Sequence, residues 1–76
     1  MINESSVEYS KLLTRREVGV ARLMGYGRTN KEIALELQLT VGTVKNYTSR
    51  IIHKLEATNR VEAAVKLFMS DIYTSD

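Results

Sequence analysis

The stretch LQLTVGTVKNYTSRIIHKL, residues 37–55, decides the fold that we expect. Residues 38–40 interrupt an apolar pattern, which resumes at once with helical spacing. At about 100° per residue, one side of this segment carries an apolar arc made of Val44, Thr48, Ile51 and Leu55. The other side is polar and holds Gly42, Lys45, Asn46, Ser49, Arg50 and His53. A short turn followed by an amphipathic helix predicts a helix-turn-helix.

Helix start signals recur along the chain. In a capping box, a Thr or Asn side chain accepts a backbone hydrogen bond, and a Glu three residues later bonds back to the backbone of the capping residue. The candidate pairs are Thr14–Glu17, Thr29–Glu32 and Asn59–Glu62, while Thr40 caps the quoted helix. The chain has no Pro, and strand-like alternation is hard to find. We therefore predict an all-α, four-helix domain over residues 13–73, with a polar leader at 1–12 and a tail at 74–76.

The fourth helix shows apolar residues at helical spacing. We expect its core stripe to consist of Val61, Ala64, Val65, Phe68 and Ile72. Ala63 and Leu67 lie off this stripe, which predicts that they remain at the surface. In the first helix, Gly19 lies in the interior, where Gly costs about 1 kcal/mol relative to Ala.

Length and composition narrow the classes of function. The chain has 76 residues, which fits one domain, and it has no Cys, which leaves neither disulfides nor a thiolate metal site. No apolar run approaches the roughly 20 residues that cross a bilayer, so we expect a cytoplasmic protein that does not enter a membrane. We expect no cofactor either. All eleven Lys and Arg lie within residues 11–70, against five acids, a net charge of +6. This basic middle favours a polyanionic partner.

The polar side of the quoted helix has the groups that read DNA. Lys45 can donate to guanine or to phosphate, Asn46 matches the adenine edge, and Ser49 is small and adaptable. Gly42 would let the start of the helix approach a duplex closely. The pattern favours a helix that lies in the major groove, although a solvated polar face fits the spacing alone.

Four motifs together suggest a family. LTRRE (13–17), TNKEIALEL (29–37), TVGTVKNYTSRIIHKL (40–55) and NRVEAAV (59–65) occur in this order. In these motifs the chain resembles the LuxR/FixJ-type, GerE-like DNA-binding domain. The resemblance implies a four-helix domain that binds double-stranded DNA as a dimer and regulates bacterial transcription. Members serve as output domains of two-component response regulators or as small stand-alone regulators, and RNA polymerase is a candidate partner.

The resemblance also implies roles for single residues. Base contacts fall on Lys45, Asn46 and Ser49, and DNA-backbone contacts fall on Lys31, Thr43, Tyr47, Arg50 and Lys54. The fourth helix is the dimer surface, for which Ala63, Lys66 and Leu67 are the candidates. Four positions depart from the family pattern, and two of them, Gly19 and Ala21, replace larger residues of the first helix. Tyr47 replaces a common His, and Gln38 replaces a Gly, which implies strain if the backbone there has a positive φ.

Rival functions rest on fewer features. Region 4 of a sigma factor has a similar helix-turn-helix, but its motif ends near the close of the reading helix, whereas this chain continues into NRVEAAVKLF. A phosphotransfer domain could use His53 but needs a longer helical bundle. A helical adaptor could use the same surface to bind another protein. Its affinity for that protein would then not depend on salt. An enzyme is not expected, because no phosphate-binding loop or nucleophile–base pair is visible.

Overall fold

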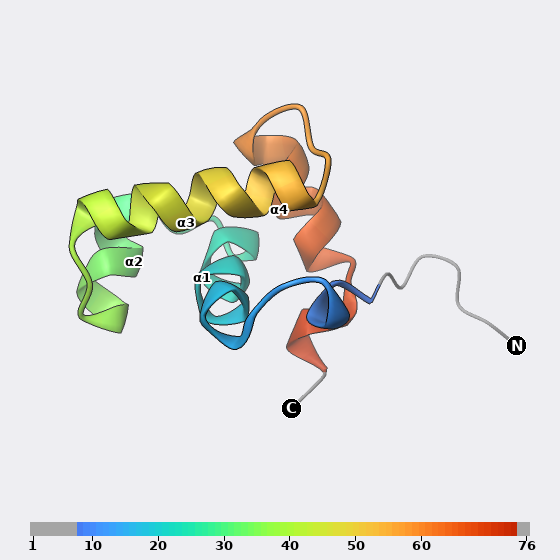
Figure 1. Cartoon of the computed structure of the whole chain (residues 1–76), viewed down its shortest axis with the longest axis horizontal. Coiled ribbons are helices and arrows are strands. Elements are labelled where there is room, and N and C mark those ends of the chain that lie inside the picture. Colours follow the sequence, from blue (N-terminus) through green and yellow to red (C-terminus); the bar gives the residue numbers. More distant parts are fainter. Residues whose placement is uncertain (1–7, 75–76) are drawn as a thin grey trace, which may run out of the picture.

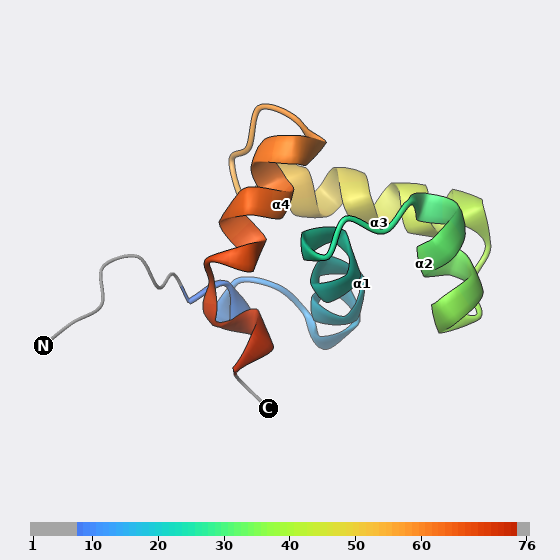
Figure 2. The same cartoon turned by 180° about the vertical axis from the view of Figure 1, so that it is seen from behind.

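The computed structural model describes residues 8–74, and this part of the chain is all-α, as predicted. Its elements are η1 (Tyr9–Lys11), α1 (Arg15–Gly25), α2 (Asn30–Leu37), α3 (Val41–Lys54), α4 (Arg60–Phe68) and η2 (Asp71–Tyr73), where η marks a short 3₁₀ helix. In Figure 1, α3 lies across one side of the domain, with α2 under its start and α1 under its middle. Figure 2 shows the same arrangement from behind, with α4 beside α1 and in front of the end of α3.

The predicted capping residues begin all four α-helices. Thr14 Oγ1 accepts a hydrogen bond from the Glu17 N–H at 3.1 Å, and Glu17 Oε1 accepts one from the Thr14 N–H at 2.8 Å. Thr29 and Glu32 form the same reciprocal pair at 3.1 and 2.9 Å. Each box satisfies two backbone donors that a helix start otherwise leaves free.

The other two helix starts use a single capping bond. Thr40 Oγ1 accepts from the Thr43 N–H at 3.1 Å. Asn59 Oδ1 accepts from the Glu62 N–H at 2.9 Å, but the Glu62 carboxylate accepts from the Thr58 N–H instead of returning to Asn59. Asn59 therefore caps α4 as predicted. The predicted capping box is incomplete, because the Glu62 side chain bonds to the Thr58 N–H and not to the Asn59 N–H.

Three helices end on a residue with left-handed backbone geometry. These residues are Gly27 (φ 84°), Gln38 (φ 58°) and Glu56 (φ 54°). After each one, the next N–H bonds to the carbonyl five residues earlier, as Leu39 does to Ala34 at 2.9 Å. Only Gly adopts this geometry without a steric cost from Cβ. The positive φ considered for Gln38 is therefore present, and the turn between α2 and α3 carries that cost.

The core lies where α1 meets the other three α-helices. Its buried apolar residues are Leu13, Val20, Ala21, Met24, Ile33, Ala34, Val44, Ile51, Leu55, Ala63, Leu67 and Ile72. The apolar arc predicted for α3 is confirmed, because Val44, Thr48, Ile51 and Leu55 are all buried. This burial leaves the opposite side of α3 at the surface.

The predicted core stripe of α4 is wrong. Val61, Val65 and Phe68 are 74, 55 and 62% exposed, whereas Ala63 and Leu67 are fully buried. The main neighbour of α4 is α1, and the helix turns its Ala63 and Leu67 side into the core. Ile72 is buried as expected, but it lies in η2 and not in a continuation of α4. Val61, Val65 and Phe68, which were expected in the core, therefore form an exposed apolar face of α4.

The two terminal segments pack together. Ser10 in η1 donates its N–H to Asp71 Oδ1 at 3.1 Å, so part of the stretch assigned to a leader joins the domain. Tyr73 in η2 donates its hydroxyl to the Arg22 carbonyl at 2.7 Å and lies over Gly25. Burial and the neighbouring Tyr26 raise the pKa of Tyr73 to about 12. The rest of the predicted leader, residues 1–7, and tail residues 75–76 lie outside the described residues.

Candidate nucleic-acid interface

The three candidate base readers share one exposed face of α3. Lys45, Asn46 and Ser49 are all exposed, and their spacing of three and four residues places them side by side on the helix. The opposite face of α3 is buried in the core, and the segment Val41–Lys54 has no Asp or Glu. This face therefore offers hydrogen-bond donors and positive charge with no acid on the same helix.

A shallow hollow of about 160 Å³ lies beside these residues. It is lined by Thr43, Asn46, Tyr47 and Arg50, which come from successive turns of α3. The guanidinium carbon of Arg50 lies 5.6 Å from the centre of the Tyr47 ring, within cation–π range. The ring restricts where the guanidinium can point. The hollow thus combines an amide, two hydroxyls and a cation, which suit a base edge or a phosphate.

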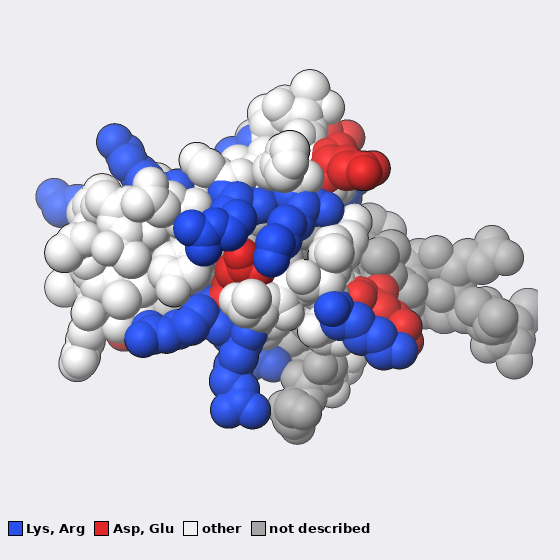
Figure 3. All heavy atoms as spheres, viewed as in Figure 1, with Lys and Arg blue, Asp and Glu red and all other residues white. Residues whose placement is uncertain are grey.

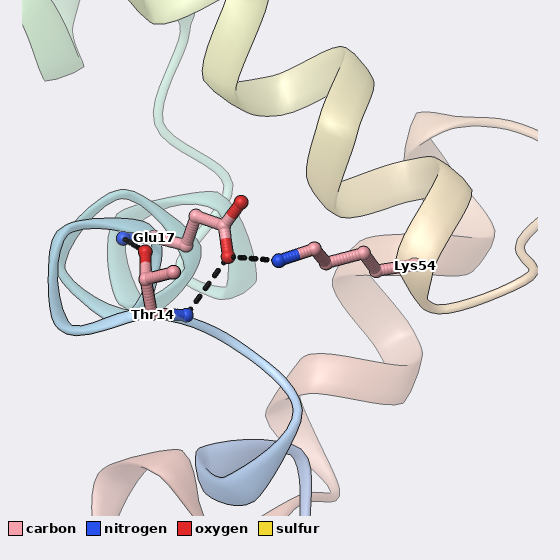
Figure 4. Close-up of polar contacts among 3 residues, drawn as sticks. All are labelled: Thr14, Glu17 and Lys54. Carbon is pink, nitrogen blue, oxygen red and sulfur yellow. Dashed lines mark hydrogen bonds and ion pairs between the residues drawn. The ribbon is translucent and has the colours of Figure 1, made fainter.

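Lys54, one of the expected DNA-backbone contacts, forms an ion pair within the domain. Its Nζ lies 2.7 Å from Oε1 of Glu17, and Figure 4 shows the two side chains pointing toward one another from α3 and α1. Burial of the carboxyl raises the pKa of Glu17, but the hydrogen bonds from Lys54 and Thr14 and the Lys54 charge outweigh it and lower the pKa below 4.5. Lys54 therefore joins two helices.

The predicted dimer residues do not form a surface patch. Ala63 and Leu67 are fully buried within the domain, so a second subunit cannot reach them. Lys66 donates from Nζ to the carbonyls of Leu55 and Glu56, at 3.1 and 3.4 Å, where α3 ends. The apolar face of α4 that is exposed was expected in the core, because its spacing was assigned to the core.

Figure 3 shows where the charged side chains lie on the face seen in Figure 1. Lys and Arg gather over the middle of this face, around α3 and the start of α1. Lys31, near the start of α2, is exposed as a backbone contact requires. Arg15 and Arg16, at the start of α1, are exposed as well. The sequence analysis assigned no role to these two arginines, although they are adjacent in LTRRE.

Residues 8–74 were also compared with the requirements of a metal site and of a membrane span. No group of three or more His, Asp or Glu in residues 8–74 could hold a metal ion. Within the same range, no helix is long and apolar enough to cross a membrane.

Known proteins resemble this chain over most of its length. Residues 11–67 match the family described as "Bacterial regulatory proteins, luxR family" (GerE). A transcriptional regulatory protein of Bacillus subtilis strain 168, YvfU, is 58% identical over 52 residues, which are 68% of this chain and 26% of that protein. The response regulator protein VraR of Staphylococcus aureus is 35% identical over 65 residues, which are 86% of this chain and 31% of VraR. The chain thus spans about a quarter to a third of the length of these relatives.

Proposed function

Because the chain belongs to the luxR family of bacterial regulatory proteins, we propose that it reads a specific sequence of double-stranded DNA with α3. Regulators of this family bind DNA, and the chain is a transcription-regulator domain of the family. What supports α3 as the reading element is its one-sided burial. A fully packed inner face fixes the helix, while an acid-free outer face can enter the major groove.

Three side chains read bases in this proposal. Lys45 donates to guanine O6 or N7, Asn46 pairs with the N6 and N7 groups of adenine, and Ser49 adapts to either neighbour. Contacts to the phosphates set the register of the helix in the groove. We assign these contacts to Lys31, Thr43, Tyr47 and Arg50. Lys54 is left out, because Glu17 already holds its ammonium group.

A second copy of the chain covers the exposed face of α4 in this proposal. Val61, Val65 and Phe68 are more than half exposed on one helix, and Met69 directly after it is 54% exposed. Exposed apolar residues that are contiguous in this way are typical of protein interfaces. Two copies related by a twofold axis through this face would present two reading helices. Their half-sites should lie about one duplex turn apart.

The regulatory context is also proposed from the relatives. VraR is named a response regulator, and it is about three times as long as the matched stretch. We propose that the chain serves as the DNA-binding output part of a two-component response regulator in the cytoplasm. RNA polymerase is then the further partner through which bound DNA leads to regulated transcription.

Selection from a randomised duplex library tests the function. We expect enrichment of a site with two related halves, bound with an affinity that falls steeply as salt rises. Lys45→Ala should weaken binding to that site by about 1–3 kcal/mol and relax the preference at one base pair. Lys11→Ala is the matched control, because Lys11 is exposed on η1 and paired with Glu8.

Two results would contradict the proposal. Failure to enrich any sequence would rule out sequence reading by the isolated chain and would favour a protein-binding adaptor. Enrichment with unchanged affinity and base preference in Lys45→Ala would remove Lys45 from the reading set.

A further inference from the structure

We infer that Arg15 and Arg16, at the start of α1, form a second contact with the DNA backbone beside the reading helix. The inference rests on the proposed function, since it extends the surface that α3 presents to DNA. It adds a contact from outside the helix-turn-helix formed by α2 and α3.

The first observation is that both arginines are exposed and lack an acidic partner among the described residues. Within residues 8–74, neither side chain forms an ion pair or a hydrogen bond. The positions one turn further along α1 are Val18, Gly19 and Val20, so no acid is available at the spacing that supports ion pairs within a helix. The two positive charges are thus uncompensated by the described part of the protein.

The second observation is that the two charges occupy an unfavourable place in their own helix. They are the first two residues of α1, where the partial positive charge of the helix dipole disfavours cations. The Glu17 that follows has the sign that a helix start prefers. Local stability therefore gives no reason for this pair, and residues that oppose a local rule often serve a function. An anion placed against them would remove the repulsion.

The third observation is that α1 begins next to α3. The ion pair between Glu17 and Lys54 fixes the first turn of α1 to the last turn of α3 (Figure 4). Because this pair neutralises the Lys54 ammonium, Arg15 and Arg16 supply the free positive charge at this end of α3. The gathering of cations around α3 and the start of α1 in Figure 3 is consistent with one continuous surface.

The partner that fits is the phosphate backbone of the duplex whose groove holds α3. The arginine pair continues a surface already proposed to face DNA, and guanidinium groups bind phosphate with paired hydrogen bonds. A phosphate contact carries no sequence information, so the pair should strengthen binding without changing the preferred site. The arginine pair therefore differs from Lys45, Asn46 and Ser49, whose proposed base contacts determine the preferred site.

Salt dependence of binding tests the inference. Wild type, Arg15→Gln, Arg16→Gln and the double variant are titrated against the selected duplex and a scrambled duplex by fluorescence anisotropy at several salt concentrations. We expect the slope of log K against log salt to become shallower by about 1 for each arginine removed. Affinity for the selected and the scrambled duplex should fall by the same factor. Lys11→Gln removes an exposed cation that Glu8 already pairs, and its slope should stay close to wild type.

The outcomes separate this inference from the proposed function. An unchanged slope in a double variant that keeps its helical circular dichroism would overturn the phosphate contact, while the selected site could still be bound. A changed base preference would also overturn it, because the arginines would then read sequence. Equal affinity of wild type for both duplexes would overturn the proposed sequence reading, yet a shallower slope in the variants would still support the backbone contact. Absence of any DNA binding by wild type would overturn both.

Discussion

The Nζ of Lys54, in the last turn of α3, lies 2.7 Å from Oε1 of Glu17, the carboxylate that caps α1. The same carboxylate oxygen accepts the Thr14 N–H at 2.8 Å. One buried group therefore completes the start of α1 and ties it to the helix that we propose to read DNA. Glu17 is 1% exposed, whereas the Lys54 side chain is 30% exposed, so the pair lies at the edge of the core. Its contribution to stability can be measured directly.

Glu17→Gln should lower the free energy of unfolding at pH 7 by about 1–3 kcal/mol, because the amide can still accept from Thr14 but loses its ionic bond to Lys54. The folded protein lowers the pKa of Glu17 below 4.5, so its ionised form stabilises the fold. This stabilisation is complete above pH 4.5 and is lost as the pH falls through the lower, folded pKa. The difference in unfolding free energy between wild type and Glu17→Gln, measured by urea unfolding, should therefore shrink as the pH falls from 7 to 3.

Glu32→Gln is the matched control for this experiment. Glu32 forms the same capping box at the start of α2, but it is exposed and forms no ion pair within residues 8–74. We expect its substitution to change the free energy of unfolding by less than about 0.5 kcal/mol. Equal losses in the two variants would show that the negative charge at the start of a helix, and not the ion pair with Lys54, is what Glu17 contributes.

Gln38→Gly should raise the free energy of unfolding by about 0.5–1 kcal/mol. Gln38 has φ 58° and ψ 45°, a geometry in which Cβ crowds the backbone and Gly does not. The gain is smaller than the relieved strain, since Gly also has more freedom in the unfolded chain. Thermal or urea unfolding measures it, with Gln38→Ala as the control that keeps Cβ. A loss of stability in the Gly variant would show that the Gln38 side chain makes a contact of its own.

Gly19→Ala should stabilise the protein by about 0.5–1 kcal/mol, because Ala lowers the entropic cost of a helix interior. A Cβ at position 19 would meet no atom within 4 Å, so nothing opposes the gain. Gly25→Ala should act in the opposite direction, since its Cβ would lie 1.8 Å from the Tyr73 hydroxyl oxygen. Tyr73 would then have to leave its bond to the Arg22 carbonyl. The two unfolding curves should lie on opposite sides of wild type, and a shift in the same direction would contradict this account of the glycines.

Val65→Glu should weaken self-association at least about tenfold and leave the fold intact. Val65 is 55% exposed on α4, so a carboxylate is solvated in the monomer but would be buried between two copies. Sedimentation with the two-half duplex should show one bound copy at concentrations where wild type binds as two. Leu35→Glu, an 82% exposed position on α2, is the control for adding an acid at an apolar surface site. Dimers that survive Val65→Glu would remove the α4 face from the proposed interface.

Signals between near neighbours in the sequence were sufficient to predict the helices. Thr14, Thr29, Thr40 and Asn59 cap the four α-helices as predicted, because a cap depends only on backbone groups two or three residues away. The buried arc of α3 was also predictable. Its apolar residues fall on one narrow side and leave no competing face. The outward position of Lys45, Asn46 and Ser49 follows from that arc.

The sequence by itself determined the four helices, their starts and the two sides of α3, whereas only the tertiary structure decided which side of α4 is buried. Apolar residues surround more than half of α4, so its periodicity fits either the Val61–Val65–Phe68 side or the Ala63–Leu67 side. Packing against α1 selects Ala63 and Leu67 and leaves the larger stripe at the surface. The pairing of Lys54 with Glu17 was hidden for the same reason. The two residues are 37 positions apart, and no local rule brings them together.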